Sequence, residues 1–403
     1  MLILYLIAGV ICMAESKLEI RQIPGQAELG TVEIHGVSAG AFNPELWQKG
    51  KLNFLPDVCS PIIEPRKSGV FRNIYAPSAV EIEDGWRLFY GAWDGVGSGN
   101  DRIYSVTTRD FLDFDNRRIE IEHGDFIHCC NVSAIRLPGG ECRLMCTVYP
   151  DSRGQNKPAL FSSPDGRYWN GRRAPYHAKQ TDIISIEGYG KYPDADINGM
   201  NVLLYENGTY RLYFNNFRDF GRVYRATSED GKHFRLEEPV LEIGAVVNDV
   251  KKFRVAEGIY YLMGLHMNTD KLWYSLSLDG LHFAPARLLA GNKGKADRYM
   301  VAVGWVVENQ RVLGFLYGAG EAPTLDRNRI FGRWLQKKVV FQADDGKRYK
   351  PKAALGPDRQ ILVVPRNKEI KGNFIVYSED GSTTLLKAPG TLASGAVYTL
   401  VES

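Results

Sequence analysis

Short runs of alternating apolar and polar residues recur along the chain, and most are rich in β-branched and aromatic side chains. A clear example covers residues 200–205 and 209–214, which flank the turn Glu206-Asn207-Gly208. Such a pair predicts a β-hairpin, because Asn and Gly adopt the positive φ angles that a tight turn needs. Four more hairpins are predicted over residues 76–93, 132–148, 250–264 and 300–316. No segment shows a sustained apolar stripe of 3.6-residue period, so we expect an all-β protein.

A short sequence motif, called the corner phrase below, repeats along the chain near these hairpins. In its fullest form it reads Ser-x-Asp-Gly-x-x-aromatic, as in residues 163–169. Five copies, some of them looser, are centred on Asp110, Asp165, Asp230, Asp279 and Asp345, at spacings of 55, 65, 49 and 66 residues. In each copy the Asp side chain is predicted to cap a turn, while the aromatic ring packs between sheets. Five copies of one unit predict a five-bladed β-propeller.

The hairpins and corners place the propeller at residues 55–350. Residues 15–54 are predicted to form an N-terminal lead along its outside. Residues 351–403 contain further strand-like runs, and we expect a small β extension that completes or braces the last blade. Residues 1–14 are almost entirely apolar, a length that suits a signal peptide and is short for a membrane span. A secreted or periplasmic protein is therefore expected, with a retained anchor or a wrong start site as alternatives.

Composition and charge narrow the possible functions. The chain is 44% hydrophobic and 24% charged, as expected for a packed protein. Its formal net charge is only +3 and the basic residues are scattered, which gives no nucleic-acid footprint. Without Cys12 five cysteines remain, so at least one thiol is unpaired. The cluster His128-Cys129-Cys130 matches no zinc-binding spacing, and neither a metal nor a cofactor is expected.

The corner phrase, together with predicted inner strands that open near a Pro-Ser pair, resembles the superfamily of glycoside hydrolase families 32, 43, 68, 117 and 130. In families 32 and 43 the inner strands begin with carboxylates that face the axial funnel. Alignment of the strands by their hairpin glycines puts Ala76, Asn131, Gly199 and Asp249 at equivalent places. Among these only Asp249 is an acid, and Asn248-Asp249-Val250-Lys251 is similar to the Arg-Asp-Pro-Lys phrase of family 32. The resemblance implies that the Asp249 carboxylate faces the funnel and is catalytic.

Cleavage of a glycosidic bond typically needs two carboxyls, one as acid and one as base or nucleophile. Ala76 stands where the resembled families keep the aspartate of the first blade, so the second acid must come from elsewhere. Asp94 follows the first hairpin and Asp196 precedes the third, and both are predicted to join Asp249. Side chains predicted to contact the sugar are Tyr75, Trp93, His128, Asn131, Asn216 and His266.

These features predict an exported glycoside hydrolase that removes terminal sugars from a glycan, because the axial funnel of a propeller is closed at depth. One alternative is a carbohydrate-binding or structural propeller that lost its acids, which Ala76 favours. A second alternative is a phosphorylase, with a phosphate cradle from the arginines at positions 72, 102, 222 and 298. The expected partner is a glycan, with no nucleic acid and no membrane contact beyond an N-terminal anchor.

Overall fold

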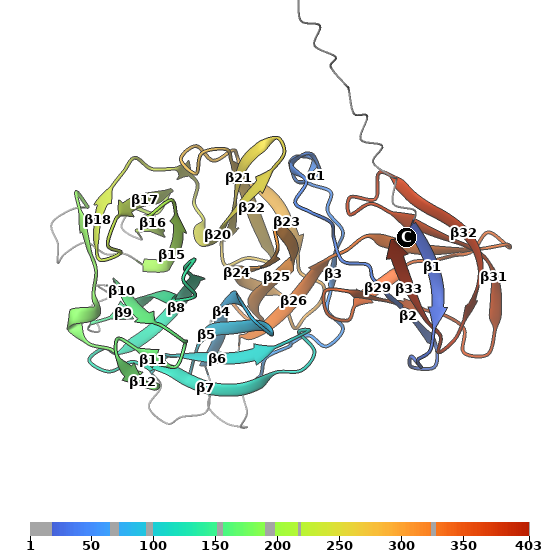
Figure 1. The fold of residues 1–403 in the computed structure, drawn as a ribbon, viewed down its shortest axis with the longest axis horizontal. Coiled ribbons are helices and arrows are strands. Elements are labelled where there is room, and N and C mark those ends of the chain that lie inside the picture. The colour runs from blue at the N-terminus through green and yellow to red at the C-terminus, as the bar shows by residue number, and fades with distance from the viewer. Residues whose placement is uncertain are drawn as a thin grey trace, which may run out of the picture.

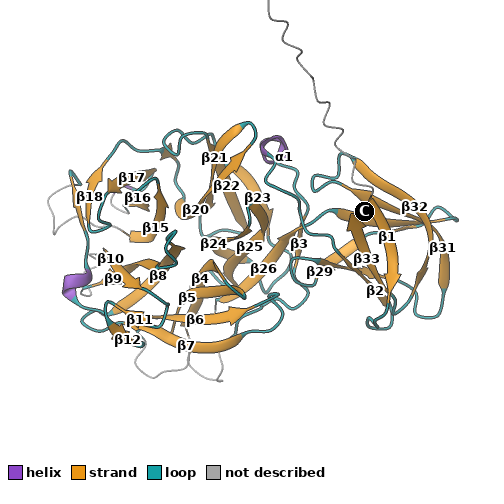
Figure 2. Ribbon diagram, in the orientation of Figure 1, coloured by secondary structure: helices purple, strands orange, loops and turns teal. Residues whose placement is uncertain are grey.

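The structure is a computed structural model that describes residues 18–64, 72–93, 100–150, 156–189, 198–216, 219–323 and 328–402, with the backbone alone at 72–74, 198 and 199. These residues are nearly all in strands or loops (Figures 1 and 2), and their helices are α1 (Pro44–Lys49) and the 3-10 turn η1 (Gln180–Asp182). Five mainly antiparallel sheets form a larger group, and a two-sheet unit lies beside it (Figure 1). The all-β prediction is confirmed.

Each of the five sheets starts from a long hairpin. The first sheet contains β4 (Arg72–Ile82), β5 (Gly85–Trp93), β6 (Arg102–Thr108) and β7 (Asp115–Glu122), with β13 (Tyr176–His177) at its edge. The second contains β8 (His128–Arg136), β9 (Cys142–Tyr149) and β10 (Lys157–Ser163), followed by the hairpin of β11 (Tyr168–Trp169) and β12 (Arg172–Arg173). The third contains β15 (Asn198–Glu206), β16 (Thr209–Asn215), β17 (Arg222–Ser228) and β18 (His233–Leu236), joined by β14 (Ser185–Glu187) and β19 (Leu241–Glu242).

The last two sheets have four strands each. The fourth contains β20 (Val246–Val255), β21 (Gly258–His266), β22 (Lys271–Ser277) and β23 (Arg287–Gly291). The fifth contains β24 (Tyr299–Glu308), β25 (Arg311–Gly320), β26 (Arg329–Leu335) and β3 (Phe54–Pro56).

The first strands of the five sheets, β4, β8, β15, β20 and β24, lie side by side. Each contacts the next, and β24 contacts β4. Side-chain hydroxyls join these strands: the backbone N–H of Ala134 donates to Ser78 Oγ at 2.9 Å, and that of Leu203 donates to Ser133 Oγ at 3.1 Å. The N-terminal ends of the first strands are thereby held at one common end of the five sheets.

Four of the five corner phrases follow the third strand of sheets one to four, as predicted. At the third-sheet corner, Asp230 Oδ1 accepts from the backbone N–H groups of Lys232 (2.8 Å) and His233 (2.9 Å), and Ser228 Oγ accepts from Gly231 N (2.9 Å). The hydrogen bond with the His233 side chain, at 2.7 Å from Asp230 Oδ2, and the backbone bonds to Asp230 hold the pKa of Asp230 well below its usual range. The aspartates of the phrase are therefore turn residues, as the sequence indicated.

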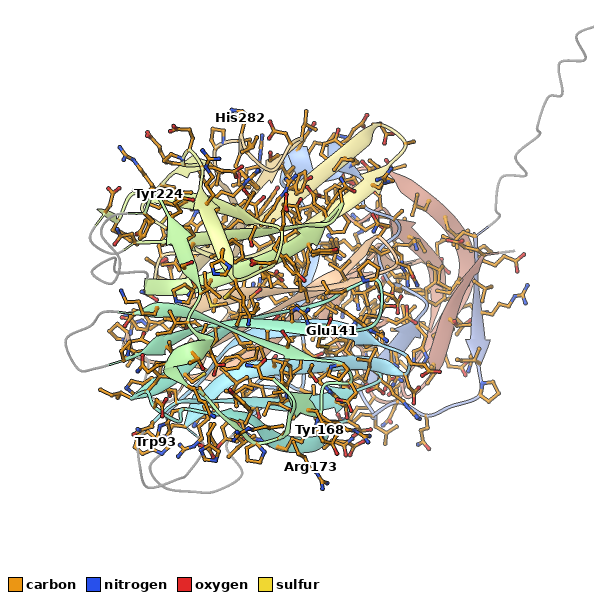
Figure 3. All side chains as sticks on the ribbon, turned by 60° about the vertical axis from the view of Figure 1, so that its left-hand side comes forward. Trp93, Glu141, Tyr168, Arg173, Tyr224 and His282 are labelled. Carbon is orange, nitrogen blue, oxygen red and sulfur yellow. The ribbon has the colours of Figure 1, made fainter. Side chains whose placement is uncertain are left out.

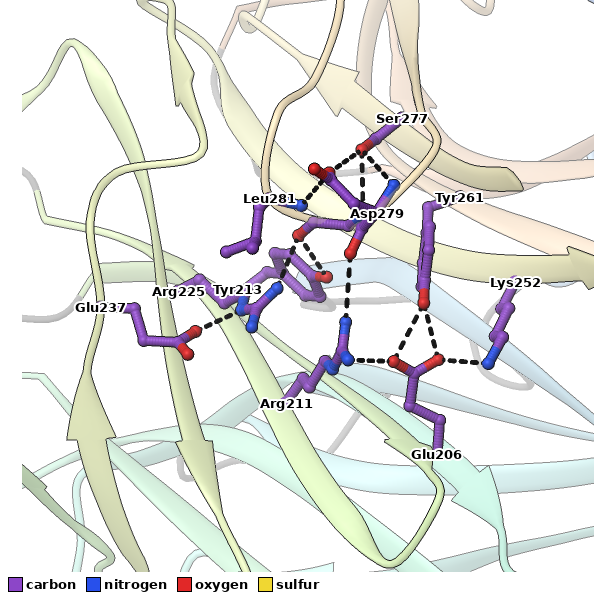
Figure 4. Close-up of polar contacts among 11 residues, drawn as sticks. Glu206, Arg211, Tyr213, Arg225, Glu237, Lys252, Tyr261, Ser277, Asp279 and Leu281 are labelled. Carbon is purple, nitrogen blue, oxygen red and sulfur yellow. Dashed lines mark hydrogen bonds and ion pairs between the residues drawn. The ribbon is translucent and has the colours of Figure 1, made fainter. Parts of the chain in front are cut away.

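The corner of the fourth sheet forms hydrogen bonds with the third sheet (Figure 4). The carbonyl oxygen of Gly280 accepts from Tyr213 Oη at 2.9 Å and from Arg225 Nη1 at 3.0 Å, both in the third sheet. Arg211 of the same sheet donates to the carbonyl oxygen of Asp279 at 3.4 Å. The corner thus presents its backbone carbonyls to the preceding sheet and joins the two. Its neighbour His282 lies on the outer rim of the molecule (Figure 3).

The fifth copy of the phrase is not in the fifth sheet, and this part of the prediction is wrong. Asp345 lies between β27 (Lys338–Ala343) and β28 (Arg348–Tyr349), which belong to the two-sheet unit. The fourth strand of the fifth sheet is β3, which pairs with β26. Asp345 Oδ1 still accepts from Lys347 N at 2.9 Å, as in the other corners. The phrase therefore identifies a type of turn and not a type of sheet.

The two-sheet unit combines both ends of the described chain. One sheet has the order β1 (Leu18–Ile23), β33 (Val397–Glu402), β2 (Thr31–His35), β30 (Arg359–Val363), β29 (Pro351–Ala354). The other has the order β28, β27, β31 (Glu369–Tyr377), β32 (Thr384–Ala393). Their shared core includes Val32, Phe341 and Leu392. The predicted lead thus supplies β1 and β2 here and β3 to the fifth sheet, and β27 pairs with β31 across the predicted boundary at residue 350.

The predicted signal peptide, residues 1–14, lies outside the described residues. Among the helices that the structure describes, none has the length and hydropathy of a membrane span.

Candidate functional site

The sequence candidates meet at one end of the five sheets. Because each hairpin is antiparallel, the start of a first strand lies beside the end of its second strand: His128 pairs with Tyr149, and Val246 with His266. Tyr75 and Asn131 lie near the starts of β4 and β8, and the half-buried Trp93 and Asn216 lie at or just beyond the ends of β5 and β16. Asp94 and Asp196 lie outside the described residues. We call this region, where the first strands start, the site end.

The floor of the site end is apolar. Each first strand contributes at least one nearly fully buried side chain to a common cluster, which includes Ala76, Cys130, Met200, Val247 and Val301. None of these side chains is more than 4% exposed. The space between the first strands is therefore filled at this depth, and a ligand that enters from the site end meets a closed bottom.

Four of the first strands carry an extra residue near this floor, at Ala76, Asn131, Asn248 and Ala302, where the pairing with the second strand shifts. Three of these residues have positive φ angles of 51° to 54°. Such bulges re-aim side chains and are frequent next to active sites. The expected equivalence of Asp249 with Ala76 and Asn131 is off by one residue, because the extra residue of the fourth sheet is Asn248.

Asp249 lies on an inner strand, as predicted, and its carboxylate is occupied by neighbours. Oδ2 accepts from the backbone N–H of Trp305 at 2.9 Å, which joins β20 to β24. Oδ1 forms an ion pair with Lys251 Nζ at 3.0 Å. The residue is only 4% exposed. These contacts favour a role in holding the fourth and fifth sheets together.

His266 is buried and bonded to the neighbouring Asn248. Its Nδ1 lies 2.7 Å from Asn248 Nδ2 and 3.1 Å from Asn248 Oδ1, and the same Oδ1 accepts from Val303 N at 3.1 Å. Burial lowers the pKa of His266 to about 4. The ring is therefore neutral near pH 7. Because it is only 8% exposed, it forms part of the wall of the site end and brings no charge to it.

A second group of polar side chains connects the first and second sheets. His128 Nδ1 lies 3.2 Å from Asp101 Oδ2, and the backbone N–H of Asp101 also reaches His128 Nδ1 at 3.2 Å. The ring of Tyr149 meets the His128 ring edge-on, with 5.3 Å between centroids. Next to them the Cys130 thiol hydrogen-bonds with the hydroxyls of Tyr75 and Tyr149. Burial raises the pKa values of Cys130 and Tyr75 well above their usual range, so both are neutral.

Sequence reasoning found His128 and Tyr75 but missed Asp101. Asp101 precedes β6, the third strand of its sheet, and it reaches His128 only because Cys129 N donates to its carbonyl oxygen at 3.0 Å. In the described part of the chain, no group of three His, Cys, Asp or Glu residues suits a metal ion.

Three of the arginines proposed for a phosphate cradle have described contacts of their own. Arg102 Nε pairs with Glu122 Oε2 at 2.5 Å, and Arg222 Nη1 pairs with Asp219 Oδ2 at 3.5 Å in another sheet. Arg298 lies over the Tyr299 ring. The side chain of Arg72 is not described.

The largest described cavity, about 980 Å³, lies at the opposite end of the first strands. Its lining includes Glu81, Arg136, Glu206 and Lys251. Glu206 there is held by Tyr261 Oη at 2.8 and 2.9 Å and by Lys252 Nζ at 2.6 Å (Figure 4). Its carboxylate is therefore committed to joining the third and fourth sheets.

Comparison with known proteins gives a fold but no family. No family model and no curated protein matches the chain. The catalytic domain of a family 62 α-L-arabinofuranosidase of Coprinopsis cinerea is similar in structure, with a TM-score of 0.51 at 12% identity over 71% of this chain and 98% of that one. A candidate glycosidase of Bacteroides thetaiotaomicron gives 0.50 at 14% identity over 73% and 99%.

A third similar structure comes from a study of glycoside hydrolase family 130, whose mannoside phosphorylases include hydrolases of β-1,2-mannosidic linkages in Candida mannan. It gives a TM-score of 0.50 at 14% identity over 70% of this chain and 93% of that one. The chain thus shares the fold of these solved structures, and no family is assigned to it.

Proposed function

We propose that the protein is a glycoside hydrolase whose five sheets are the blades of a closed β-propeller and whose substrate binds at the site end. The observation that carries this proposal is the gathering of polar and aromatic candidates at one end of a fold shared with solved glycosidases. Tyr75, Asn131, His128 and His266 come from three different sheets there. Separate strands that converge on one place suit recognition of a sugar, which needs contacts on several sides.

The acids we propose for catalysis are Asp94 and Asp196. Asp94 directly follows Trp93, the last residue of β5, and Asp196 stands two residues before Asn198, the first residue of β15. Both strand ends belong to the site end. Carboxyl separations of about 5–5.5 Å suit retention of anomeric configuration, and about 6.5–9.5 Å suit inversion. Asp249 is not included in this pair, because both of its oxygens are engaged.

The closed apolar floor supports action on chain ends. A glycan can enter the site end but cannot pass the buried side chains of Ala76, Cys130 and Met200 between the first strands. A terminal sugar can fill such a pocket, whereas an internal segment needs an open groove. We therefore propose an exo-acting enzyme, and the apolar N-terminal residues support export.

The test is hydrolysis of a panel of aryl glycosides and plant, algal and bacterial glycans by the wild type, Asp94→Asn and Asp196→Asn. Asp84→Asn is the matched control, because Asp84 is 68% exposed and lies in the turn at the opposite end of β4 and β5. We expect turnover in the wild type and the control, and a loss of about a hundredfold or more in at least one of the other variants. Equal turnover in all four proteins would contradict the assignment of the acids.

The binding alternative is favoured by one specific observation. None of the extra residues Ala76, Asn131, Asn248 and Ala302 carries a carboxylate. Glycan binding without product formation over the whole panel would support this alternative. Release of a sugar phosphate that requires inorganic phosphate would instead support a phosphorylase.

A further inference from the structure

The side chains of His128 and Asp101 form an ion pair at the site end. Neither residue belongs to the two carboxyls that the proposed function names. We infer that His128 is the proton-exchanging residue of the site end and that Asp101 is the residue that positions and charges it. This inference rests on the proposed function for its reaction, and on the geometry of the two side chains for its assignment.

The different exposure of the two side chains indicates which of them can contact a ligand. The Asp101 side chain is only 7% exposed, so a substrate oxygen has little access to it, whereas the His128 side chain is 21% exposed. A buried carboxylate that faces an imidazole nitrogen fixes the ring and stabilises its protonated form. The exposed member of the pair is then the group that exchanges a proton with a ligand.

The distances define which nitrogen is free. Asp101 Oδ2 lies 3.2 Å from His128 Nδ1, an ion-pair distance when the ring is protonated. Both contacts of Asp101 are to Nδ1, so Nε2 is the ring nitrogen that faces a ligand and can exchange a proton with it. The backbone N–H of Asp101 reaches the same Nδ1 at 3.2 Å and can hold the ring in the neutral tautomer whose Nδ1 carries no proton. Asp101 therefore contacts Nδ1 in either state without a movement of the ring.

Asp101 is the charged residue described next to the His128 ring. The other titratable groups described around the imidazole are Tyr149, which packs edge-on against it, and the hydrogen-bonded Cys130 and Tyr75. Cys130 and Tyr75 are neutral because they are fully buried. Asp101 Oδ1 is buried and has no hydrogen-bond partner among the described residues. The cationic partner that the described residues place against the Asp101 carboxylate is the imidazolium of His128, at 3.2 Å.

In hydrolysis His128 would first donate one proton and later take one back. Nε2 gives its proton to the leaving oxygen as the glycosidic C–O bond breaks, and the water that adds to the anomeric carbon gives up the proton that returns to Nε2. One water is consumed and one sugar and one alcohol are formed. His128 then takes the acid role of the proposed pair, and the role at the anomeric carbon belongs to one of its two carboxylates, Asp94 or Asp196.

Two measurements test the inference. The first is an NMR measurement of the ring-nitrogen shifts of the histidines in the wild type and in Asp101→Asn, which needs no substrate. We expect the Nδ1 and Nε2 shifts of His128 to change in the variant, because Asp101 Oδ2 lies 3.2 Å from Nδ1. The matched comparison is His282, whose Nδ1 lies 2.7 Å from Asp279 Oδ2 at an outer corner and whose shifts should be the same in both proteins.

The second measurement is the pH dependence of kcat/KM on the aryl glycoside that the wild type hydrolyses best. His128→Gln should lower kcat/KM about a hundredfold or more and remove one limb of the pH profile, while Asp101→Asn should lower kcat/KM and change the position of that limb. His282→Gln should leave rate and profile unchanged. Unchanged ring-nitrogen shifts of His128 in Asp101→Asn, or a His128→Gln enzyme with the wild-type profile, would overturn the inference. If no glycoside is hydrolysed at all, the proposed function fails, and the NMR measurement alone still shows whether Asp101 acts on the His128 ring.

Discussion

The buried imidazole of His266 should make the protein less stable as the pH falls from about 6.5 to about 4. Burial lowers its pKa from 6.5 to about 4 in the folded protein. Between these values the unfolded chain binds a proton at His266 and the folded protein does not. The free energy of unfolding therefore decreases as the pH falls through this window, and the loss is complete below the folded pKa.

The size of the effect follows from the shift. Each pKa unit corresponds to 1.36 kcal/mol, so a shift of about 2.5 units is worth about 3 kcal/mol, of which about 2 kcal/mol is lost between pH 7.5 and pH 5. His266→Gln removes the titrating ring and keeps a polar group that can bond to Asn248. It should lower stability at pH 7.5, because the packing around a fully buried ring changes, and it should flatten the pH dependence.

The assay is urea unfolding of the wild type and His266→Gln at pH 7.5, 6.5, 5.5 and 5.0. The difference in unfolding free energy between the two proteins isolates His266, because Asp230, Glu206 and the other titrating groups are common to both. We expect this difference to shrink by about 2 kcal/mol from pH 7.5 to pH 5. His177→Gln is the control at an exposed histidine and should follow the wild type. A difference that stays constant with pH would refute the claim that His266 is buried and neutral.

Two further predictions concern the contacts between sheets. Asp249→Asn keeps an acceptor for the neighbouring backbone N–H but leaves Lys251 without its ion pair, so it should cost about 2 kcal/mol in urea unfolding, and Asp249→Ala should cost more; an Asn variant of full stability that is inactive would instead restore Asp249 as a catalytic acid. Gly280 has φ +72° and an added Cβ would meet Tyr213 Oη at 2.9 Å, whereas Gly346 has φ +86° and no atom within 4 Å. Thermal unfolding should therefore show a larger loss for Gly280→Ala than for Gly346→Ala, and equal losses would contradict the proposed role of the fourth-sheet corner.

Hairpins and turns could be predicted from the sequence, because neighbouring residues determine them. Alternating runs around short turns, two of them Asp-Gly or Asn-Gly, predicted the hairpins of the five sheets. The Ser-x-Asp-Gly phrase and its looser copy predicted the four corners at Asp110, Asp165, Asp230 and Asp279. The same chemistry misled at Asp345, because an identical turn can end a strand of any sheet. Which strand completes the fifth sheet depends on long-range pairing of β3 with β26, and a local pattern cannot show that.

The site was only partly predictable, for related reasons. The bulge that makes Asn248 the extra residue shifts Asp249 by one place, and a bulge has no strong signature in a single sequence. Asp101 approaches His128 across two sheets, and its position before a third strand gave no reason to expect this. A possible signal was the acidic residue next to Arg102 at the start of β6. The roles of Asp94 and Asp196 stay a prediction.

The central claim is that a glycan binds at the site end. The most direct measurement is a crystal structure of the Asp94→Asn or Asp196→Asn variant with the best oligosaccharide from the hydrolysis panel. The account predicts a terminal sugar above the floor of Ala76, Cys130 and Met200, with a hydroxyl or the glycosidic oxygen within hydrogen-bond distance of His128 Nε2. A sugar bound instead in the 980 Å³ cavity beside Glu206 and Lys251, at the opposite end of the first strands, would contradict it.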